Sequence, residues 1–356
     1  MRHITTTLAA LFWLSLAASA DADILVGVAA PLSGPSAILG QQIENGAGLA
    51  AEAQGVAVKS VDDACTADGG AAAARQFADA KVTIVVGFLC TEAIEAALPI
   101  LKDANIPVIT VGVRTESLTD RRAKTGWPVY RLGPRGDDER NAVARILTQL
   151  WQNELFAIID DGTIYGREIA ETFRAAAEQA ALKPVFVDTF RPQLDNQIGL
   201  IGRLKKAGAT RVFAGGDGDD IAIMGRDAAQ LDTGITFAGG ETLRTQPGDV
   251  PYEVGTLMIA LPEWAEVANP KIMQAFAERK IVTDGYTLPA YAAVEVAKAA
   301  AADAESSGKP LAETLTGHDF ATVIGTFRFD EKGDLSQNPF RIFRFDGTHF
   351  VPLEEN

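Results

Sequence analysis

The sequence contains few of the residues on which most catalytic and metal sites depend. Its 356 residues include only two cysteines and three histidines, and His3 lies in an N-terminal segment that we expect to be removed. This scarcity nearly excludes a histidine-based catalytic triad or a multi-histidine metal site. The sequence also lacks a G-x-x-x-x-G-K-[ST] phosphate loop, a G-x-G-x-x-G motif after a strand and a G-x-S-x-G nucleophile elbow. No nucleophile or acid–base pair stands out, so we expect no enzyme and no metal or cofactor site.

One aspartate-rich segment, residues 216–220, has the sequence Gly-Asp-Gly-Asp-Asp and could suggest calcium binding. It lacks the glycine and the distal glutamate of an EF-hand loop. A solvated turn that caps the following helix is the simpler interpretation.

Positive charge and long apolar runs are also scarce. There are 32 basic against 47 acidic residues, a formal net charge of −15, which argues against nucleic acid and anionic membranes as partners. Arg2, the apolar residues 8–16 and the small residues 18–20 have the pattern of a secretory signal peptide, cleaved between Ala20 and Asp21. No later run approaches the roughly 20 apolar residues of a membrane span. We expect a soluble periplasmic protein without a lipid anchor.

Both cysteines, Cys65 and Cys90, lie beyond the expected cleavage site. Two cysteines in an exported chain favour one disulfide, and two free buried thiols are the alternative. Such a bridge would close a loop of about 25 residues and stabilise the fold by roughly 3 kcal/mol in the chain-entropy model.

Short apolar runs alternate with amphipathic helical runs along most of the chain. This alternation predicts parallel strands joined by right-handed helical crossovers, and the length suggests roughly two domains. The expected strands are residues 24–30, 56–61, 83–87, 106–111, 155–159, 184–188, 211–214 and 235–238. The expected helices are residues 41–53, 70–80, 91–104, 138–153, 166–181, 198–207, 220–230, 270–279, 287–302 and 311–315. The fold class is therefore α/β with two doubly wound parallel-sheet units.

Three further segments have extended patterns. Residues 127–131 are expected to be an extended connection rather than a core strand, and residues 256–261 a second connection. Near the end, two alternating runs, residues 325–330 and 339–345, flank a turn at residues 330–333.

Residues 61–101 carry the clearest indication of a binding site. A short buried strand, residues 84–87, is followed almost at once by a helix with Thr91 at its expected N-cap. The threonine hydroxyl and the free N–H groups of the first turn would favour a small anion there. Strand–turn–helix units occur in every α/β protein, so an ordinary structural unit is the alternative interpretation.

Several short motifs, in this order and spacing, resemble the leucine/isoleucine/valine-binding family of periplasmic substrate-binding proteins, which serve ABC importers. The resemblance covers essentially the whole chain after the signal peptide. The motifs are Leu32-Ser33-Gly34-Pro35, Asp62-Asp63-Ala64-Cys65, Gly87-Phe88-Leu89-Cys90-Thr91, Asp160-Asp161-Gly162-Thr163-Ile164-Tyr165-Gly166, Arg203-Leu204-Lys205-Lys206, Gly239-Gly240-Glu241 and Phe329-Asp330-Glu331-Lys332-Gly333-Asp334.

The resemblance implies two lobes of the type I periplasmic-binding fold, joined by three crossings, with a ligand held between them by hinge closure. The crossings would lie near residues 130–134, 255–261 and 333–338. The N-terminal lobe would comprise residues 21–132 and 259–334, and the C-terminal lobe residues 133–258 and 335–356. A monomeric receptor that delivers a small molecule to a membrane permease, without covalent chemistry, is implied.

The resemblance also assigns roles to individual residues. Thr91 matches a serine that holds the ligand's carboxylate, and the backbone of Gly112 accepts its ammonium group. Glu241 matches the carboxylate that pairs with that ammonium, because a buried charge requires a partner. Tyr165 and Tyr286 match aromatic residues that pack on the ligand. The family's paired cysteines fall on Cys65 and Cys90.

Three departures from the family pattern weaken the prediction of the ligand. Arg114 replaces a threonine that helps to hold the carboxylate, Leu39 replaces an aromatic residue and Asp217 replaces a tyrosine. An arginine could bind a carboxylate with two hydrogen bonds, or reach a second acidic group. We therefore expect an amino acid or a related small carboxylate, with an aromatic or dicarboxylic acid as the alternative.

Two other functions remain open at this point. A sensory or regulatory receptor would have the same fold and differ only in the partner that it contacts. A secreted enzyme on a doubly wound scaffold is a third possibility, because fold does not fix function, but it would require a clustered acid–base group.

Overall fold

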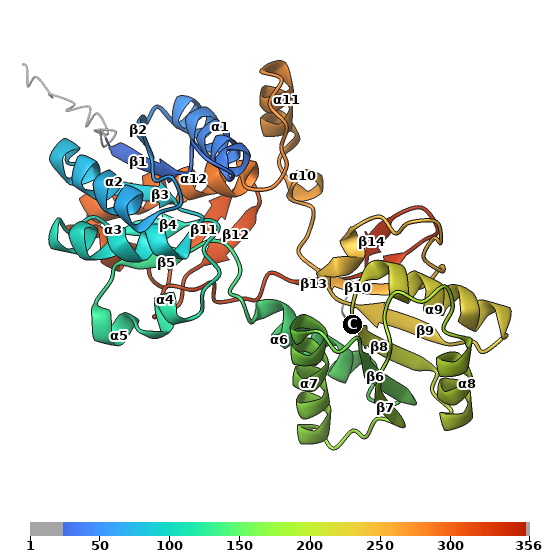
Figure 1. The fold of residues 1–356 in the computed structure, drawn as a ribbon. Helices are drawn as coiled ribbons and strands as arrows, with labels where there is room; N and C mark the ends of the chain where they lie inside the picture. The colour runs from blue at the N-terminus through green and yellow to red at the C-terminus, as the bar shows by residue number, and fades with distance from the viewer. Residues whose placement is uncertain (1–23, 354–356) are drawn as a thin grey trace, which may run out of the picture.

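The computed structural model describes residues 24–353 and contains two separate main sheets. The expected signal peptide, residues 1–20, lies outside the described residues. Figure 1 shows the two sheets in two lobes, with the N-terminal part of the chain in one and the green and yellow part in the other. The predicted fold class, α/β with two doubly wound sheets, is confirmed.

The first lobe is built on a five-stranded parallel sheet in the order β2-β1-β3-β4-β5. Its strands are β1 (Leu25–Ala30), β2 (Ala57–Asp62), β3 (Ile84–Gly87), β4 (Val108–Thr110) and β5 (Val129–Arg131). The prediction that residues 127–131 form only an extended connection is wrong. All three residues of β5 are buried, and the strand pairs in parallel with β4, because Val129 and Tyr130 supply apolar side chains to opposite faces of the sheet.

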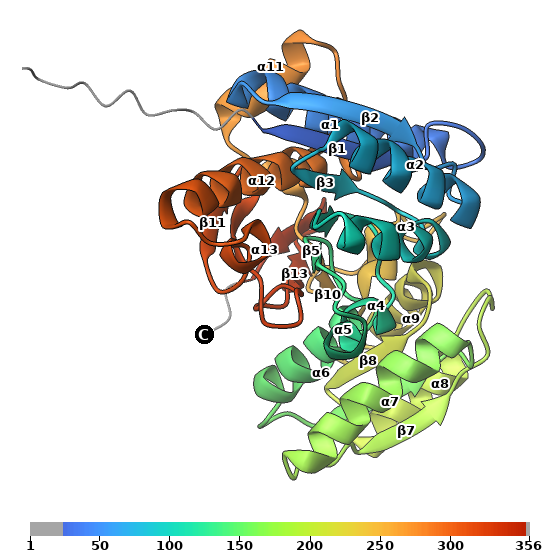
Figure 2. The ribbon, with the colours of Figure 1, turned by 90° about the vertical axis from the view of Figure 1, so that its left-hand side faces the viewer.

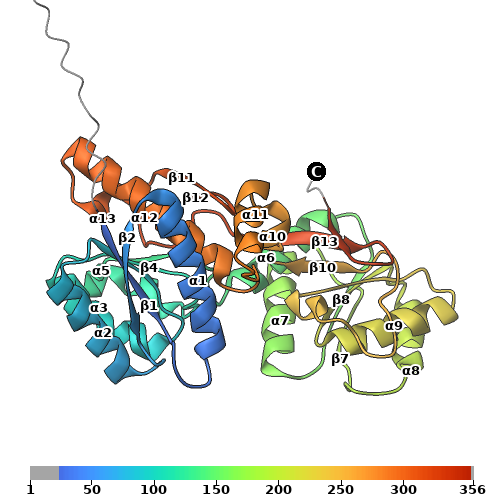
Figure 3. The same cartoon turned by 90° about the horizontal axis from the view of Figure 1, so that it is seen from above.

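Helices cover both faces of this sheet (Figure 3). On one face, α1 (Ala37–Gln54) and α12 (Thr287–Ser307) pack on Val26, Val28 and the other strand residues whose side chains point to that face. On the other, α2 (Ala67–Ala80) and α3 (Thr91–Asp103) pack on Val85 and Val108. Successive residues of a strand point to opposite faces, so a short, wholly apolar strand can fill two cores at once.

The second lobe contains a seven-stranded sheet in the order β14-β13-β10-β9-β8-β6-β7. The five parallel strands are β6 (Phe156–Asp160), β7 (Phe186–Thr189), β8 (Arg211–Gly215), β9 (Thr236–Gly239) and β10 (Leu257–Ala260). Strand β13 (Arg341–Phe345) pairs antiparallel with β10, and β14 (Phe350–Pro352) pairs antiparallel with β13. One face is covered by α6 (Asp138–Leu150) and α7 (Ile164–Gln179), the other by α8 (Ile198–Ala207) and α9 (Gly218–Gln230). Figure 2 shows this lobe below the first.

The C-terminal residues do not form the two paired strands that the alternating runs around the turn at residues 330–333 would suggest. The run after residue 324 forms β12 (Gly325–Arg328), which pairs with β11 (Asp319–Thr322), whereas β13 joins the second lobe's sheet. The two runs that flank the turn therefore belong to different sheets. The remaining elements are α4 (Ser117–Asp120), α5 (Arg122–Thr125), η1 (Glu241–Arg244), α10 (Trp264–Val267), α11 (Pro270–Glu278) and α13 (Leu311–Thr314).

The chain passes between the two lobes three times, after β5, after β10 and between β12 and β13 (Figure 1). We call these passages the first, second and third crossing. The segment expected to be the second crossing, residues 255–261, contains β10, a strand of the second sheet. A lobe boundary between residues 258 and 259 would thus fall inside a strand. Within residues 24–353, no helix is long and apolar enough to span a bilayer.

The predicted disulfide between Cys65 and Cys90 is present. It links the loop after β2 to the residue that precedes α3, so it fastens two loops at one edge of the first sheet. Its Cα atoms lie 5.1 Å apart and its ends are 25 residues apart in sequence.

Replacing Cys90 with serine should lower the melting temperature by several degrees while the circular dichroism spectrum stays that of the folded protein. The loss corresponds to roughly 3 kcal/mol of loop-closure entropy in the unfolded chain. Cys65→Ser is the matched control, because it breaks the same bridge and should give the same shift, and the double variant should add little. An unchanged melting curve under oxidising conditions would contradict a stabilising role.

Candidate functional site

The edge of the first sheet that carries the carboxyl ends of its strands is shaped by a sharp turn after β3. Gly87 and Phe88 both have positive φ angles, +112° and +56°, and a Cβ atom on Gly87 would lie 2.1 Å from the carbonyl oxygen of Ala29. Only glycine can occupy this position. The turn directs the chain to Cys90, which is extended, and α3 then begins.

Thr91 lies at the start of α3, but not where we expected it. The N-cap is Cys90, so Thr91 is the first residue inside the helix and the N-cap prediction is wrong by one position. The oxygen of its hydroxyl is 2.6 Å from that of Thr115, which follows β4. Two adjacent hydroxyls and the free N–H groups of a helix start make a suitable place for a carboxylate. We did not predict Thr115 from the sequence, because it follows a different strand, β4.

Two of the predicted binding residues, Gly112 and Tyr286, lie close together. A Cβ atom on Gly112 would be 2.2 Å from Leu89 Cδ2 and 3.1 Å from Tyr286 Cε1, so the loop backbone packs directly on both side chains. Tyr286 is held at the start of α12 by a 3.1 Å hydrogen bond from its N–H to Gln42 Oε1.

The second lobe supplies Tyr165 and Glu241, which a third residue connects. The Tyr165 hydroxyl donates to Glu139 Oε1 at 2.7 Å, and the Glu241 N–H donates to the same oxygen, also at 2.7 Å. Glu139 therefore joins α6, α7 and the segment after β9. We did not predict Glu139 from the sequence, because a carboxylate in the first turn of a helix normally only complements the helix dipole.

The surroundings of Glu139 favour its neutral form. Burial raises the pKa of this carboxyl, and the nearby Glu241 carboxylate raises it further, against the opposing effects of the two hydrogen bonds and of Arg114. Burial likewise raises the pKa of the Tyr165 phenol, with Glu139 contributing. The hydroxyl is therefore a hydrogen-bond donor at all ordinary pH values.

Replacing Glu139 with glutamine should keep both hydrogen bonds, since an amide oxygen also accepts, and remove the cost of burying the charge. The wild-type carboxyl has a raised pKa, so the folded state binds a proton more readily than the unfolded state and gains stability as the pH falls through the folded-state pKa. The melting temperature of Glu139→Gln should exceed that of the wild type by a few degrees at pH 7, and this difference should shrink towards pH 4.5. Glu139→Leu, which cannot accept, is the control and should melt lower at both pH values.

Two ion pairs cross from one lobe to the other beside these residues. Arg114 Nη1 of the first lobe lies 3.9 Å from Glu241 Oε2 of the second, with the two side chains 46% and 26% exposed. Arg140 Nη2, in α6, lies 3.0 Å from Glu116 Oε1. One predicted binding residue of each lobe, Arg114 and Glu241, therefore lies within ion-pair distance of the other.

Asp217 and Leu39 are less closely connected to this arrangement. Asp217 is exposed at the N-cap of α9, after Gly216, whose carbonyl oxygen accepts a 2.8 Å hydrogen bond from Thr242. Leu39 is 37% exposed on α1. Within residues 24–353, neither side chain forms a hydrogen bond or ion pair with the other predicted binding residues.

A cavity of about 700 Å³ lies elsewhere, at the second and third crossings, where Trp264, Phe327 and Leu335 line it. None of the predicted binding residues contributes to it. In the part of the chain that the structure describes, no group of three or more His, Cys, Asp or Glu side chains is placed to hold a metal ion.

The two-lobed fold agrees with the family that the chain matches. A family model described as periplasmic binding protein matches residues 23–349. The chain belongs to this family. Its curated homologues include Leu/Ile/Val-binding protein homolog 3 of Brucella melitensis biotype 1, which is 30% identical over 358 residues, 96% of each chain.

Solved structures of this family share the fold. A putative branched-chain amino acid ABC transporter protein from Rhodospirillum rubrum has a TM-score of 0.77 at 18% identity, over 93% of this chain and all of that one. An ABC transporter solute-binding protein from R. palustris, in complex with benzoate, has a TM-score of 0.58 at 19% identity, over 93% of this chain and 95% of that one. The curated homologue is a Leu/Ile/Val-binding protein, and the R. palustris structure is that of a solute-binding protein of an ABC transporter.

Proposed function

We propose that this protein is the periplasmic receptor of an ABC importer and captures an amino acid or related small carboxylate between its lobes. The observation that supports this most strongly is the pair of Arg114 and Glu241, which brings a cation of one lobe and an anion of the other to the same place. A ligand that contacts both would stabilise the closed arrangement of the lobes, which the importer could recognise.

In this proposal the carboxylate of the ligand lies against Thr91, Thr115 and Arg114. An ammonium group would contact Glu241 and the backbone of Gly112, and the rest of the ligand would pack on Tyr165 and Tyr286. Asp217, at the second lobe's side of the site, would meet a basic or hydroxylated ligand tail. Charge-assisted hydrogen bonds at both ends would fix the orientation of a zwitterion.

An aromatic or dicarboxylic acid is the second candidate, and one observation favours it. Arg114 already lies beside Glu241, so the Glu241 carboxylate keeps a cationic partner even when the ligand has no ammonium group. The structural relative that holds benzoate makes this class a reasonable second choice.

The other parts of the proposal follow from the family. The protein would be exported with the first 20 residues removed, act as a monomer, catalyse no reaction and deliver its ligand to a membrane permease. We propose that the N-terminal lobe comprises residues 21–132 and 261–334. The C-terminal lobe would comprise residues 133–260 and 335–356. A sensory receptor would have the same architecture and no permease partner.

A thermal-shift screen of the mature protein against amino acids, aromatic acids and dicarboxylates tests the proposal. A ligand at 100 times its dissociation constant adds about 2.7 kcal/mol to the stability of the folded state. We expect one class to raise the melting temperature by several degrees. No shift with any carboxylate would contradict the proposed ligand class, whereas a shift with neutral sugars alone would point to a different receptor.

A further inference from the structure

The loop after β4, residues 112–116, carries three of the first lobe's proposed ligand contacts, Gly112, Arg114 and Thr115, and is bonded to β5 and to the first crossing. Three consecutive carbonyl oxygens of the loop accept hydrogen bonds from Arg131, the last residue of β5, and from Gly136 of the first crossing. The bonds run from Arg131 Nη1 to Val113 at 2.6 Å, from the Gly136 N–H to Arg114 at 2.8 Å and from Arg131 Nη2 to Thr115 at 3.0 Å. β5 and the first crossing therefore hold the loop through three hydrogen bonds.

Arg131, the last residue of β5, is fully buried, which is unusual for an arginine. Its guanidinium also donates to Thr119 Oγ1 at 2.9 Å and, through Nε, to Asp334 Oδ1 at 2.8 Å. A buried cation is stable only when an anion and further acceptors surround it. Here the anion comes from the third crossing, 203 residues along the chain.

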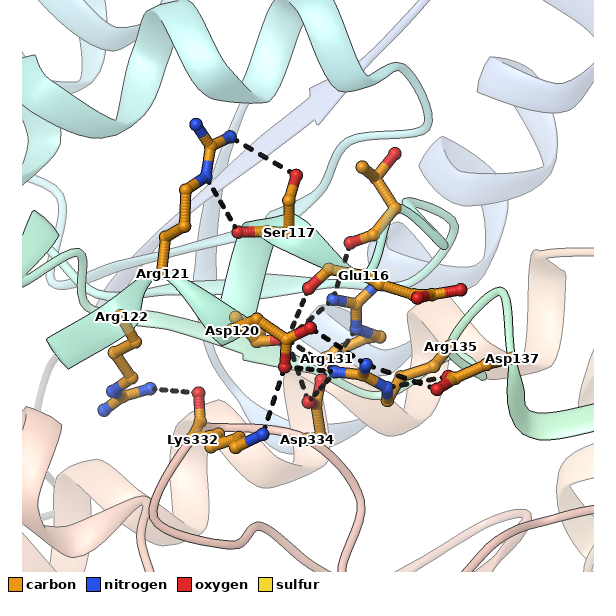
Figure 4. A network of polar contacts seen from close by, with 12 residues as sticks. Glu116, Ser117, Asp120, Arg121, Arg122, Arg131, Arg135, Asp137, Lys332 and Asp334 are labelled. Atoms are coloured by element: carbon orange, nitrogen blue, oxygen red, sulfur yellow. Dashed lines mark hydrogen bonds and ion pairs between the residues drawn. The ribbon is translucent and has the colours of Figure 1, made fainter. Parts of the chain in front are cut away.

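Asp334 is itself only 3% exposed and connects two crossings (Figure 4). Its Oδ2 accepts from Arg135 Nη1 at 2.8 Å and from the Thr119 hydroxyl at 2.8 Å, in addition to the bond from Arg131 to Oδ1. The backbone joins the same segments, because the Arg131 N–H donates to the Gly333 carbonyl at 2.7 Å. The first crossing, the third crossing and the loop therefore share one buried network.

We propose that Arg131 and Asp334 are positioning residues that couple the ligand-binding loop to the hinge. Lobe closure changes the backbone of the crossings, and because Arg131 holds two carbonyls of the loop, the loop moves with them. A ligand that contacts Arg114 and Thr115 then favours the hinge angle at which the loop fits it. The inference rests on the proposed function for the ligand, but the coupling between hinge and loop can be measured without one.

The test uses amide hydrogen exchange of the ligand-free mature protein, read by mass spectrometry. Asp334→Asn changes a residue of the third crossing that contacts Arg131, Arg135 and Thr119 but none of the loop residues 112–116. Coupling predicts that exchange of peptides confined to the loop, residues 112–116, nevertheless becomes about tenfold faster, the scale of one lost hydrogen bond to a charged group. Peptides over β6 and β8 in the second lobe should keep their wild-type rates.

Two further variants make the result decisive. Thr119→Val removes the hydroxyl that bridges Arg131 and Asp334 without removing a charge, and it carries the test if Asp334→Asn does not fold. Lys332→Met is the matched control, because it breaks an exposed ion pair of the third crossing, with Asp120 at 3.1 Å, that does not contact the loop. Its loop peptides should exchange at the wild-type rate.

Binding is measured separately, by calorimetry with L-leucine and with benzoate as probes. For whichever probe binds the wild type, the dissociation constant should rise about tenfold in Thr119→Val and stay unchanged in Lys332→Met. Unchanged loop exchange in folded Asp334→Asn and Thr119→Val would overturn the coupling. Faster loop exchange together with no binding of any carboxylate to the wild type would support the coupling and contradict the proposed function.

Discussion

Replacing Glu241 with alanine should weaken the binding of an α-amino acid by at least about a hundredfold. A ligand ammonium taken out of water needs a charged partner, and leaving it without one costs about 3–5 kcal/mol. Each 1.4 kcal/mol is a factor of about ten in the dissociation constant. The Glu241 side chain is 26% exposed and already lies near two cations, Arg114 and Arg244, each at 3.9 Å. Its position is therefore suited to an incoming ammonium group.

The measurement is calorimetry with L-leucine and with 4-methylpentanoate, which has the same carbon skeleton without the amino group. Only leucine should lose affinity, because only leucine presents an ammonium to Glu241. Glu263→Ala is the matched control, since Glu263 is also a partner of Arg244 but is more exposed, at 54%, and has no predicted contact with the ligand. Equal losses for both acids would assign Glu241 a structural role, and unchanged leucine binding would remove it from the site.

Most of the architecture could be predicted from local patterns, because each strand–helix unit of an α/β protein is encoded within a few tens of residues. The helix predicted at residues 198–207 is the observed α8, and β1 and β9 lie within one residue of their predicted bounds. The disulfide could be predicted for another reason, namely that an exported chain with two cysteines has only one possible internal pair. Strand β5 was missed because three residues after a Trp-Pro pair give too short a pattern, and its burial depends on its neighbour β4.

The site could be predicted less completely from the sequence, because its geometry depends on contacts between distant residues. Glu139 accepts a hydrogen bond from the backbone of Glu241, 102 residues away, and Arg131 meets Asp334 across 203 residues. Neither pair has a local signature, since an acidic residue in a first helical turn and an arginine at a strand end are ordinarily exposed. The roles of Thr91, Gly112, Arg114, Tyr165, Asp217, Glu241 and Tyr286 in binding stay predictions.

Replacing Arg114 with methionine should weaken carboxylate binding by about tenfold to a hundredfold, the range for one or more hydrogen bonds to a charged group. Methionine keeps much of the length of the side chain and removes the charge and all donors. Arg114→Lys should recover only part of the loss, because an ammonium cannot form the two parallel bonds of a guanidinium. Arg121→Met is the matched control, an arginine of similar exposure, 49% against 46%, that pairs with Glu95 instead.

The two site variants should have opposite effects on ligand preference, and this contrast is their most informative result. In Arg114→Met, Glu241 keeps its charge and loses one of its two nearby cations, so that only Arg244 remains. Benzoate would then meet a carboxylate with less compensating charge, whereas leucine could still offer its ammonium. Benzoate should therefore lose more affinity than leucine. In Glu241→Ala the order should reverse, because Arg114 becomes fully available to a carboxylate. A gain of affinity for either acid in Arg114→Met would instead mean that Arg114 competes with the ligand for Glu241, and would contradict its role as a carboxylate contact.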